Sequence, residues 1–400
     1  MNNFIFKNPV KIYFGEGMIA SLSKEIKPAT KVLMTYGGGS IKRNGIYDQV
    51  MAALKGCTVI EFPGIEANPD YDTLLRAIEL GKKEKIDFIL AVGGGSIIDG
   101  TKFIAAGMNY EGDPWDFIIG KAKVPAAKPF GTVLTLPATG SEMNCGAVIS
   151  RRALKEKLSF HNPEGFPCFS ILDPTAIYSL PKRQIANGII DTFIHTTEQY
   201  LTTAASPAVM DRFAEGVLLT LIEKGPGLIS AEKPSYNDCA DFMMSATMGL
   251  NGFLAMGVDE DWATHRIGHE LTALHGLDHG VTLAIVWEGT MDVMRREKEA
   301  KLLQYASRIW NITEGTTDEI IDKAIAQTEK FFNSLGVKTR LSDYGIGEET
   351  IEFIRKRFAE RNWNLGENGT GIWERTEPLL RKRQKRYSDP DYRIPNQVTA

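Results

Sequence analysis

The chain has 400 residues, 43% of them hydrophobic and 24% charged, with a formal net charge of −4. These values are ordinary for a folded globular chain, and the small negative charge argues against a nucleic-acid partner. The length exceeds the usual size of one hydrophobic core, so we expect two domains. The four cysteines form no CxxC pair, no apolar run reaches the about 18 residues of a membrane span, and the first residues do not resemble a signal peptide. We therefore expect a cytoplasmic protein that has no membrane partner.

The first element is residues 3–14, which have the composition of a strand interrupted by Pro9. This pattern is typical of a bent strand or of a strand at the edge of a sheet. An unpaired edge can pair with another subunit, so we expect a homodimer.

Two short apolar strands follow, at residues 31–36 and 88–92, and each runs into the sequence Gly-Gly-Gly-Ser. Between them lie a strand candidate at 57–62 and a helix candidate at 70–84. Strands that alternate with helices predict βαβ units and a parallel sheet. The expected fold of this part is an α/β, Rossmann-like dinucleotide-binding domain.

Each glycine run joins a strand to a helix, where backbone N–H groups can approach a phosphate at the positive helix end. The runs are Gly37-Gly38-Gly39-Ser40 and Gly93-Gly94-Gly95-Ser96. Neither is a GxGxxG fingerprint, because positions 42 and 98 are Lys and Ile, and glycine-rich turns also occur simply to form tight corners. Two such turns at strand ends in one domain nevertheless favour nucleotide binding.

A further strand at 130–135 ends in small hydroxylic residues that could line the same crevice. Residues 147–160 indicate a hairpin, and 169–172 a strand that returns to the sheet. Asp173-Pro174 and Leu180-Pro181 then punctuate the chain and mark a domain boundary.

Beyond Pro181 the hydrophobic period becomes helical, and the expected helices are 182–200, 206–223, 239–256, 261–275, 280–296, 300–311, 317–335 and 348–361. We therefore divide the chain into an α/β domain of residues 1–180, an all-α domain of residues 181–370 and an irregular tail of residues 371–400. The tail contains the basic run 381–386, whose composition is typical of a disordered, solvated segment.

Five of the six histidines gather with one aspartate in the helical domain. Asp191 and His195 are four positions apart, so they share one face of a helix. The other four histidines of this group are His265, His269, His275 and His279. Imidazole nitrogens with a carboxylate oxygen suit a divalent ion such as Zn²⁺ or Fe²⁺.

His265 and His279 would lie about 21 Å apart along one unbroken helix. Both can reach one ion only if the chain breaks between them, and Gly276 can end a helix while Asp278 can cap the next one. The pairs 265/269 and 275/279 both have helical spacing, so spacing alone leaves several choices of four ligands.

Taken in their order and spacing, these motifs resemble the iron-containing (group III) alcohol dehydrogenase family, and within it the butanol dehydrogenase and NADPH-dependent aldehyde reductase branch. The resemblance covers the chain from about residue 4 to about residue 370, beyond which the sequence no longer looks like the closing helix of the family. The matching segments begin at Phe14, Tyr36, Asn68, Gly93, Thr139, Asp191, Trp262 and His275.

The resemblance implies a metal site in the cleft between the two domains, with Fe²⁺ or Zn²⁺ held by Asp191, His195, His265 and His279. It places His269 beside the nicotinamide, as a catalytic proton relay, and it leaves His275 without a role. The residues that it implies for the cofactor are Gly94, Gly95 and Ser96 around the pyrophosphate, together with Gly37, Gly38, Gly39, Ser40, Asn68, Asp99, Thr135, Thr139, Asn144 and Lys157. Trp262 could form a wall of the substrate pocket or belong to the core.

The function that the resemblance implies is hydride transfer between NADP(H) and a small aliphatic aldehyde or primary alcohol. We expect NADP(H) to be preferred over NAD(H), because Gly39 stands where family members that use NAD carry Asp, and Lys42 and Arg43 follow it. Glu61 is the residue that could upset this preference by binding the ribose 2′-hydroxyl.

Two other functions are considered. A metal-dependent hydrolase or lyase would use the metal and leave both glycine turns without a role. A nucleotide sensor with a structural zinc is disfavoured, because structural sites are normally closed by four Cys or His ligands.

Overall fold

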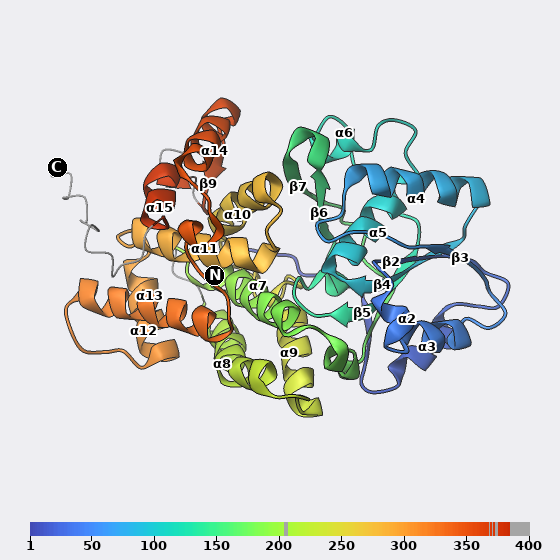
Figure 1. Ribbon diagram of the computed structural model, residues 1–400, viewed down its shortest axis with the longest axis horizontal. Coiled ribbons are helices and arrows are strands. Elements are labelled where there is room, and N and C mark those ends of the chain that lie inside the picture. The colour runs from blue at the N-terminus through green and yellow to red at the C-terminus, as the bar shows by residue number, and fades with distance from the viewer. Residues whose placement is uncertain (204–206, 368, 370, 373–374, 385–400) are drawn as a thin grey trace.

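The computed structural model describes residues 1–203, 207–367, 369, 371–372 and 375–384. The chain forms two halves that lie side by side, a sheet flanked by helices and a group of helices (Figure 1). The last strand of the large sheet ends at Leu172, and the first long helix of the helical half begins at Lys182. None of the described helices is long and apolar enough to cross a membrane.

The N-terminal half is built on a parallel sheet with the strand order β1–β8–β5–β4–β2–β3. Its strands are β1 (Lys11–Phe14), β2 (Lys31–Tyr36), β3 (Thr58–Phe62), β4 (Phe88–Gly94), β5 (Phe130–Leu136) and β8 (Phe169–Leu172). The helices of this half are α1 (Leu22–Glu25), α2 (Ser40–Arg43), α3 (Ile46–Ala53), α4 (Tyr71–Glu84), α5 (Gly95–Gly107) and α6 (Trp115–Ile118), with short 3₁₀ turns η1 (Met18–Ser21), η2 (Ser141–Met143), η3 (Arg152–Leu154) and η4 (Pro174–Ser179). The predicted Rossmann-like α/β fold is therefore confirmed.

The central strands are buried on both faces, which explains why they read as unbroken apolar runs. In β2, Leu33 packs with the cluster that includes α4 and α5, whereas Val32 and Met34 pack with the cluster that includes α1 and α3. This alternation follows from the period of two residues in a strand. Since β4 and β5 are parallel neighbours, their carboxyl ends lie together at the edge of the sheet where α5 begins.

The N-terminal strand is shorter than predicted. Of residues 3–14, only Lys11–Phe14 forms a strand, β1, which pairs with β8 at one edge of the sheet. Before it, the Asn8 amide donates hydrogen bonds to the carbonyls of Met143 and Asn251, which fixes the segment by side-chain bonds. The expected edge position is confirmed, and the expected length is wrong.

The predicted hairpin is present as β6 (Gly146–Arg151) and β7 (Glu156–His161), which pair antiparallel and form a separate two-stranded sheet. Lys155 turns the chain between them with a φ of 52°. In Figure 1 this hairpin lies on the side of the N-terminal half that faces helix α10.

The C-terminal half is helical, as predicted. Its elements are α7 (Lys182–Tyr200), α8 (Ala208–Ser230), α9 (Tyr236–Gly249), α10 (Ala263–His275), α11 (His279–Val293), α12 (Glu299–Trp310), α13 (Thr317–Ser334), η5 (Leu341–Tyr344), α14 (Glu348–Arg361), β9 (Asn364–Leu365), β10 (Gly371–Ile372) and α15 (Thr376–Lys382). Two predicted ends are wrong. Helix α8 continues past 223 and includes Pro226, and α9 stops at Gly249 because Gly252 and Gly257, with positive φ, turn the chain.

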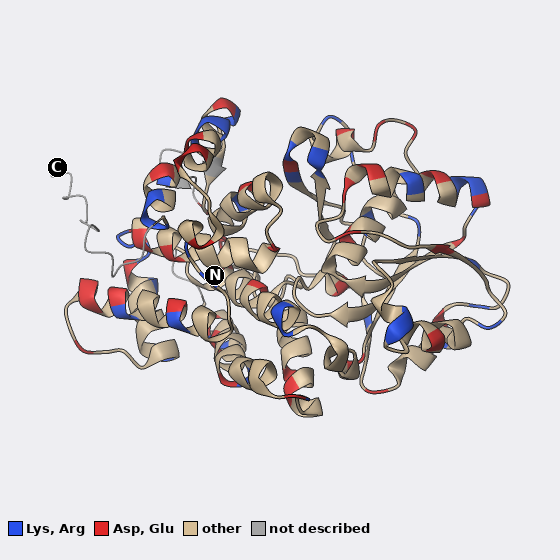
Figure 2. Ribbon diagram, viewed as in Figure 1, with Lys and Arg blue, Asp and Glu red and all other residues tan. Residues whose placement is uncertain are grey.

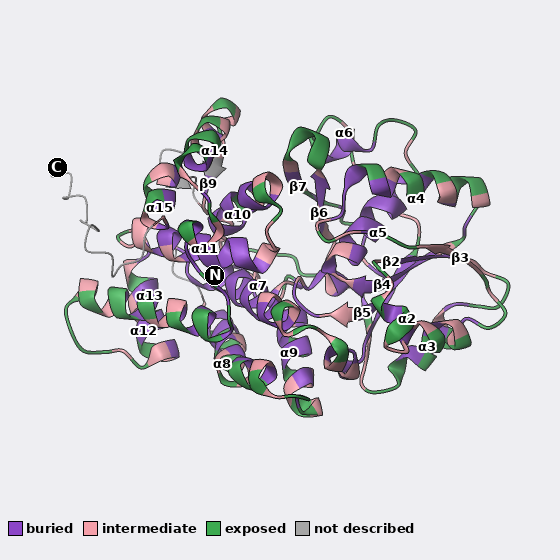
Figure 3. Ribbon diagram, in the orientation of Figure 1, coloured by how far each residue is buried: buried purple, intermediate pink, exposed green. Residues whose placement is uncertain are grey.

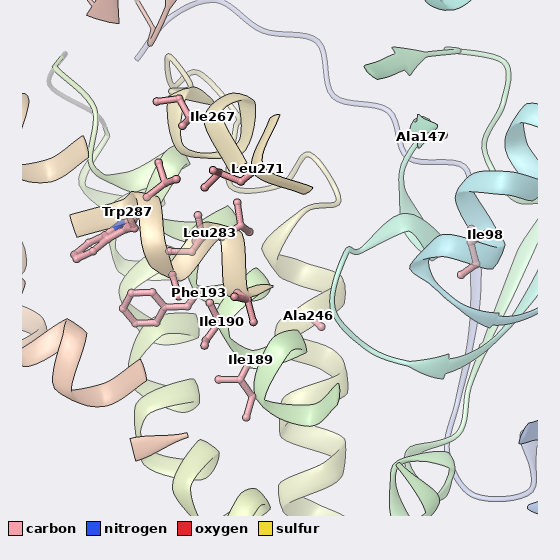
Figure 4. Close-up of a cluster of buried hydrophobic side chains, with 14 of the residues drawn as sticks. Ile98, Ala147, Ile189, Ile190, Phe193, Ala246, Ile267, Leu271, Leu283 and Trp287 are labelled. Atoms are coloured by element: carbon pink, nitrogen blue, oxygen red, sulfur yellow. The ribbon is translucent and has the colours of Figure 1, made fainter. Parts of the chain in front are cut away.

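Helices α7 and α11 form the centre of this half, and Figure 3 shows both as mostly buried. Phe193 of α7 and Trp287 of α11 meet edge to face with ring centroids 6.4 Å apart. Figure 4 shows this pair among isoleucine and leucine side chains of α7, α10 and α11. Three packed helices thus hold the backbone on which the histidine cluster is mounted.

The expected irregular tail is wrong for the part that the structure describes. Residues 376–382 form α15, and the Arg383 side chain, from the basic run, is fully buried. Its guanidinium donates to the carbonyls of Ile285 and Thr339 at 2.6 Å each and pairs with Glu288. These acceptors come from distant segments, so local composition did not reveal them. Residues 385–400 lie outside the described part of the chain.

Candidate functional site

Helix α7 presents a polar stripe inside an otherwise apolar core. Asp191, His195 and Glu198 are spaced by four and three residues, so they lie on one face of the helix, and all three are buried. His195 Nε2 lies 3.5 Å from Asp191 Oδ1. The predicted proximity of Asp191 and His195 is present.

The chain breaks and folds back after His275, as its sequence requires. Gly276 ends α10 with a φ of 67°, and α11 begins at His279. His265 Nε2 and His279 Nε2 come to 3.6 Å and 3.8 Å from Asp191 Oδ1. The donor atoms of Asp191, His195 and His265 therefore lie within 4.8 Å of one another, and His279 approaches this group from its Asp191 side.

Asp278 does not cap α11 in the way that its sequence suggested. It occupies the N-cap position, but its side chain makes no capping hydrogen bond. Its carboxylate instead accepts from Asn187 Nδ2 at 2.7 Å and pairs with Arg183 at 3.3 Å, both on α7. Asp278 thus ties the start of α11 to α7, which carries the other half of the cluster.

The cluster has the geometry of a metal site. Donors about 2.1 Å from a tetrahedral ion lie about 3.4 Å from one another. The three histidines lie 3.5–3.8 Å from Asp191 Oδ1, and Asp191, His195 and His265 are the donors that lie within 4.8 Å of one another. Asp191 Oδ1 and His265 Nε2 are buried, and neither has a hydrogen-bond partner among the described residues. One carboxylate with imidazoles suits Fe²⁺ or Zn²⁺, so the residues present fit the implied metal.

The other two histidines of the segment differ from each other. The His269 ring lies with its centroid 5.1 Å from that of His279, and its Nε2 has no hydrogen-bond partner in the described chain. His275 Nε2 instead lies 2.9 Å from Thr350 Oγ1 of α14. The structure therefore puts His269 beside the cluster and His275 away from it.

Glu198 is a residue of the site that the sequence did not single out. Its carboxylate pairs with His265 Nδ1 and accepts from the backbone N–H of Thr264 at 2.7 Å. A carboxylate behind a metal-ligating histidine fixes its tautomer and raises its basicity. The available signal was the position of Glu198, three residues after His195 and on the same helix face.

Burial and neighbouring charges act in opposite directions on these histidines. Burial lowers the pKa of His195 to about 4, and the neighbouring charge of His265 acts in the same direction. Burial also lowers the pKa of His269 and His279 well below the usual value, and the charge of Lys157 adds to this effect. Burial also acts to lower the pKa of His265, but the charges of Glu198 and Asp191 outweigh burial and raise this pKa to about 9. His195, His269 and His279 are thus held neutral, the form that binds a metal ion or accepts a proton, whereas His265 would have to release its proton to bind one.

In the N-terminal half, the second glycine run joins β4 to α5. A Cβ on Gly95 would meet Thr139 at 2.4 Å, and one on Gly94 would meet Leu136 at 2.9 Å. These glycines are therefore required for close packing of α5 on β5, whatever else they bind. The first turn of α5 has no capping side chain and no acidic residue, so its N–H groups are suited to an anion.

The first glycine run differs at its second and third positions, where packing leaves room for a side chain. Gly38 has open space where a Cβ would stand, and so has Gly39, although Gly39 has a φ of 85°. The run leads directly into α2, which begins at Ser40. An open, side-chain-free turn at the carboxyl end of a parallel strand is where a nucleotide binds in such sheets.

Asn68, Ser96 and Lys157 join three segments at the mouth of this crevice. The backbone N–H of Asn68 donates to Ser96 Oγ at 3.2 Å, and Lys157 Nζ donates to Asn68 Oδ1 at 2.9 Å. Burial lowers the pKa of Lys157 to about 8, against the opposing charges of Asp191 and Asp99. The structure brings these three predicted residues together.

Asp99 and Asn144 make their hydrogen bonds within the protein. Asp99 accepts from Ser141 Oγ at 2.6 Å and from the N–H of Val148 at 2.8 Å. The Asn144 amide makes four bonds, two accepted from Lys102 Nζ and the N–H of Gly146 and two donated to carbonyls. With its capacity filled, Asn144 braces the loop before β6, and the buried Lys102 at the centre of this network was not anticipated.

Thr135, Thr139 and Trp262 are all half-buried. Thr135 is half-buried near the carboxyl end of β5, and Thr139 is half-buried in the turn that follows. The Trp262 ring packs edge-on against His265 with centroids 5.2 Å apart and is itself half-buried. Its role as a pocket wall or as a core residue stays a prediction.

A parallel sheet with glycine turns at the carboxyl ends of two strands, together with a buried aspartate and three histidines, defines a metal-dependent enzyme that uses a nucleotide cofactor. Comparison with known proteins agrees with this class. The family model described as "Iron-containing alcohol dehydrogenase" matches residues 9–174, and that of "Fe-containing alcohol dehydrogenase family, C-terminal" matches residues 185–368. The chain belongs to the iron-containing alcohol dehydrogenase family and is therefore an oxidoreductase that acts on CH–OH donors.

Among characterised proteins, the chain is 53% identical over 372 residues to the NADPH-dependent aldehyde reductase YqhD of Escherichia coli, covering 92% of this chain and 96% of that protein. It is 40% identical over 368 residues to NADH-dependent butanol dehydrogenase A of Clostridium acetobutylicum, covering 90% and 94%. These relatives do not favour the hydrolase or lyase alternative.

Solved structures show the same fold. The crystal structure of E. coli K-12 YqhD has a TM-score of 0.93 at 51% identity and covers 96% of this chain and 99% of that one. The NADH-dependent butanol dehydrogenase A of Thermotoga maritima has a TM-score of 0.92 at 38% identity, with coverage of 96% and 99%. The likeness therefore extends over both halves of the molecule.

Proposed function

We propose that the protein reduces small aliphatic aldehydes to primary alcohols, and catalyses the reverse reaction, with NADP(H) and one divalent metal ion, Fe²⁺ or Zn²⁺. The observation that carries the proposal is the approach of three imidazoles, those of His195, His265 and His279, to within 3.5–3.8 Å of Asp191 Oδ1. These four residues would hold the metal. The relative at 53% identity, named as an NADPH-dependent aldehyde reductase, supports the substrate and the cofactor.

The bound groups would supply a Lewis acid for the carbonyl oxygen and a hydride for its carbon. The chain's own residues hold and orient them. Glu198 fixes the ring of His265, and the open glycine turn admits the nucleotide. His269, with a buried Nε2 that has no partner among the described residues, is the group placed to move the proton of the hydroxyl.

Cofactor preference is proposed from the first glycine turn and its surroundings. The rival residue Glu61 already accepts from Tyr36 at 2.5 Å, Tyr47 at 2.6 Å and Lys42 at 2.9 Å. Hydrogen bonds from the two tyrosines, assisted by Lys42, lower its pKa to about 2. A carboxylate so occupied has little capacity left for a ribose hydroxyl, which supports the preference for NADP(H).

The preference is tested by steady-state kinetics with butanal on metal-loaded protein, following the near-ultraviolet absorbance of the reduced cofactor. We expect kcat/KM to be at least roughly tenfold higher with NADPH than with NADH, about 1.4 kcal/mol. The Gly39→Asp variant should reduce or reverse this ratio, because a carboxylate would repel the 2′-phosphate. Equal values for the two cofactors in the unaltered protein would contradict the proposal.

We also propose a homodimer in the cytoplasm. Phe4, Ile5 and Phe6 precede the edge strand β1 and expose 48%, 99% and 44% of their surface, which favours association with a second copy. All four cysteines are free thiols, as is usual in a reducing compartment. Sedimentation equilibrium on the protein with Ile5→Asp tests the dimer, which this charge should dissociate.

A further inference from the structure

The tip of the β6–β7 hairpin, in the N-terminal half, is bound by two arginines of α14, in the C-terminal half. Arg361 Nη2 pairs with Glu156 Oε1 at 2.5 Å, across 205 positions of sequence. Arg357 Nη1 donates to the carbonyl of Lys155 at 2.8 Å. Figure 2 shows that α14 carries many charged residues. These two arginines are the ones that contact the hairpin of the other half.

The Arg357 side chain also contacts helix α10, which carries His265 and His269. Arg357 Nη1 also pairs with Glu270 Oε2 at 2.5 Å, and Glu270 follows His269 directly in the chain. The Glu270 side chain is only 3% exposed and that of Arg357 12% exposed, so water screens this pair weakly. One guanidinium therefore joins the hairpin of the first half to the histidine helix of the second.

On the cleft side, the next residue of the hairpin is Lys157. Successive side chains of a strand point to opposite faces, so the Glu156 side chain that meets α14 is followed by a Lys157 side chain that points to Asn68. Lys157 is 6% exposed, and through Asn68 it is linked to Ser96 at the start of α5. The position of the hairpin thus determines where Lys157 stands in the cofactor crevice.

We propose that Arg357 and Arg361, with Lys155, Glu156 and Glu270, form a clasp that holds the two halves closed over the nicotinamide cofactor and positions Lys157 against it. The inference rests on the proposed function, since the ligand held is NADPH. Closure and opening at this clasp control how fast the cofactor leaves. Both arginines are positioning residues, since they contact the hairpin and α10 and not the reacting atoms.

The test measures NADPH binding directly, by fluorescence titration and by stopped-flow release, on metal-loaded protein. We expect Arg361→Ala to raise the Kd for NADPH about tenfold, chiefly through faster release. The amount of bound metal should stay unchanged. The KM for NADPH should rise while kcat is unchanged or higher. The matched control is Arg355→Ala on the same helix, because Arg355 pairs within the C-terminal half, with Glu352 and Glu377.

A charge exchange distinguishes the clasp from a general loss of stability. Glu156→Arg alone should weaken NADPH binding as Arg361→Ala does, and the double variant with Glu156→Arg and Arg361→Glu should recover most of the loss. If the unaltered protein binds NADPH and Arg361→Ala has the same Kd within twofold, the clasp is overturned and the proposed function stands. Unaltered protein that binds no NADPH would overturn both.

Discussion

Asp191 shows how one buried carboxylate can organise a site. Its Oδ1 lies 3.5–3.8 Å from the Nε2 atoms of His195, His265 and His279. Among the described residues, Oδ1 has no hydrogen-bond partner. Leaving such a group unpaired would be costly in a protein interior, unless a bound cation satisfies it. Apart from the ion pairs of 3.5–3.8 Å with His195, His265 and His279, Oδ1 has no partner in the described chain, which is an argument for a metal that does not depend on any relative.

The ligand assignment predicts different results for two histidines that are four residues apart. His279→Ala should lower bound metal and turnover by at least roughly 100-fold, because it removes one of the four converging donors. His275→Ala should retain both, because its Nε2 lies against Thr350. Metal analysis, kinetics and circular dichroism on the two purified variants check this. Full metal content in His279→Ala would refute the assignment.

His269 is expected to act on the proton and not on the metal. Its ring is beside that of His279, whose Nε2 lies 3.8 Å from Asp191 Oδ1, and the His269 Nε2 has no hydrogen-bond partner among the described residues. His269→Ala should therefore keep its metal and lose roughly 100-fold or more in kcat, the usual contribution of general acid–base catalysis. Metal content measured alongside kcat decides the matter, since a variant that loses its metal would identify His269 as a ligand.

At the scale of elements, the two glycine turns have the same sequence but different structural roles. The turn before α5 is packed so closely that side chains of β5 and the following loop occupy the space of a Cβ. The turn before α2 leaves that space open at Gly38 and Gly39. Identical short motifs can therefore be required by packing in one place and be free for a ligand in the other.

This difference can be measured with two alanine variants. Gly95→Ala should destabilise the protein by about 1–3 kcal/mol, because the new methyl group overlaps Thr139. Gly38→Ala should change stability by less than about 0.5 kcal/mol, yet weaken NADPH binding if the nucleotide approaches the turn closely. Denaturant unfolding and NADPH titration of both variants test the prediction. Equal destabilisation by the two substitutions would count against it.

At the scale of the whole molecule, the C-terminal segment returns to the middle of the helical half. Arg383 is fully buried between α11 and the loop before η5, where it meets Glu288 and two backbone carbonyls. Burial lowers its pKa, against the opposing charge of Glu288. The segment is therefore part of the folded helical half that supports the cluster.

Two arginines of the basic run should differ strongly in their effect on stability. Arg383→Met should cost about 3–5 kcal/mol, because it breaks a buried ion pair and leaves Glu288 with one partner fewer. Arg381→Ala, which removes exposed pairs with Glu348 and Glu377, should cost less than about 1 kcal/mol. Urea unfolding of the two variants gives both values, and a mild effect at Arg383 would be inconsistent with its burial.

Local patterns in the chain were enough to predict the parallel sheet, the hairpin, most helices and the break at Gly276. Each depends on interactions within a few residues: the period of apolar side chains, the conformational freedom of glycine, and the spacing of four between Asp191 and His195. The family resemblance supplied the selection of four ligands that spacing had left open.

The remaining features depend on contacts between segments that are distant in sequence, and the tertiary structure alone revealed them. A basic run was expected to be solvated, yet Arg383 is buried because Glu288 and two carbonyls lie where it points. Nothing in its local sequence distinguishes Glu198 from other carboxylates, because its role depends on the position of His265 on α10. The pairing of Glu156 with Arg361 joins residues that no local pattern connects, because the free energy of such a contact depends on the fold that brings the two side chains together.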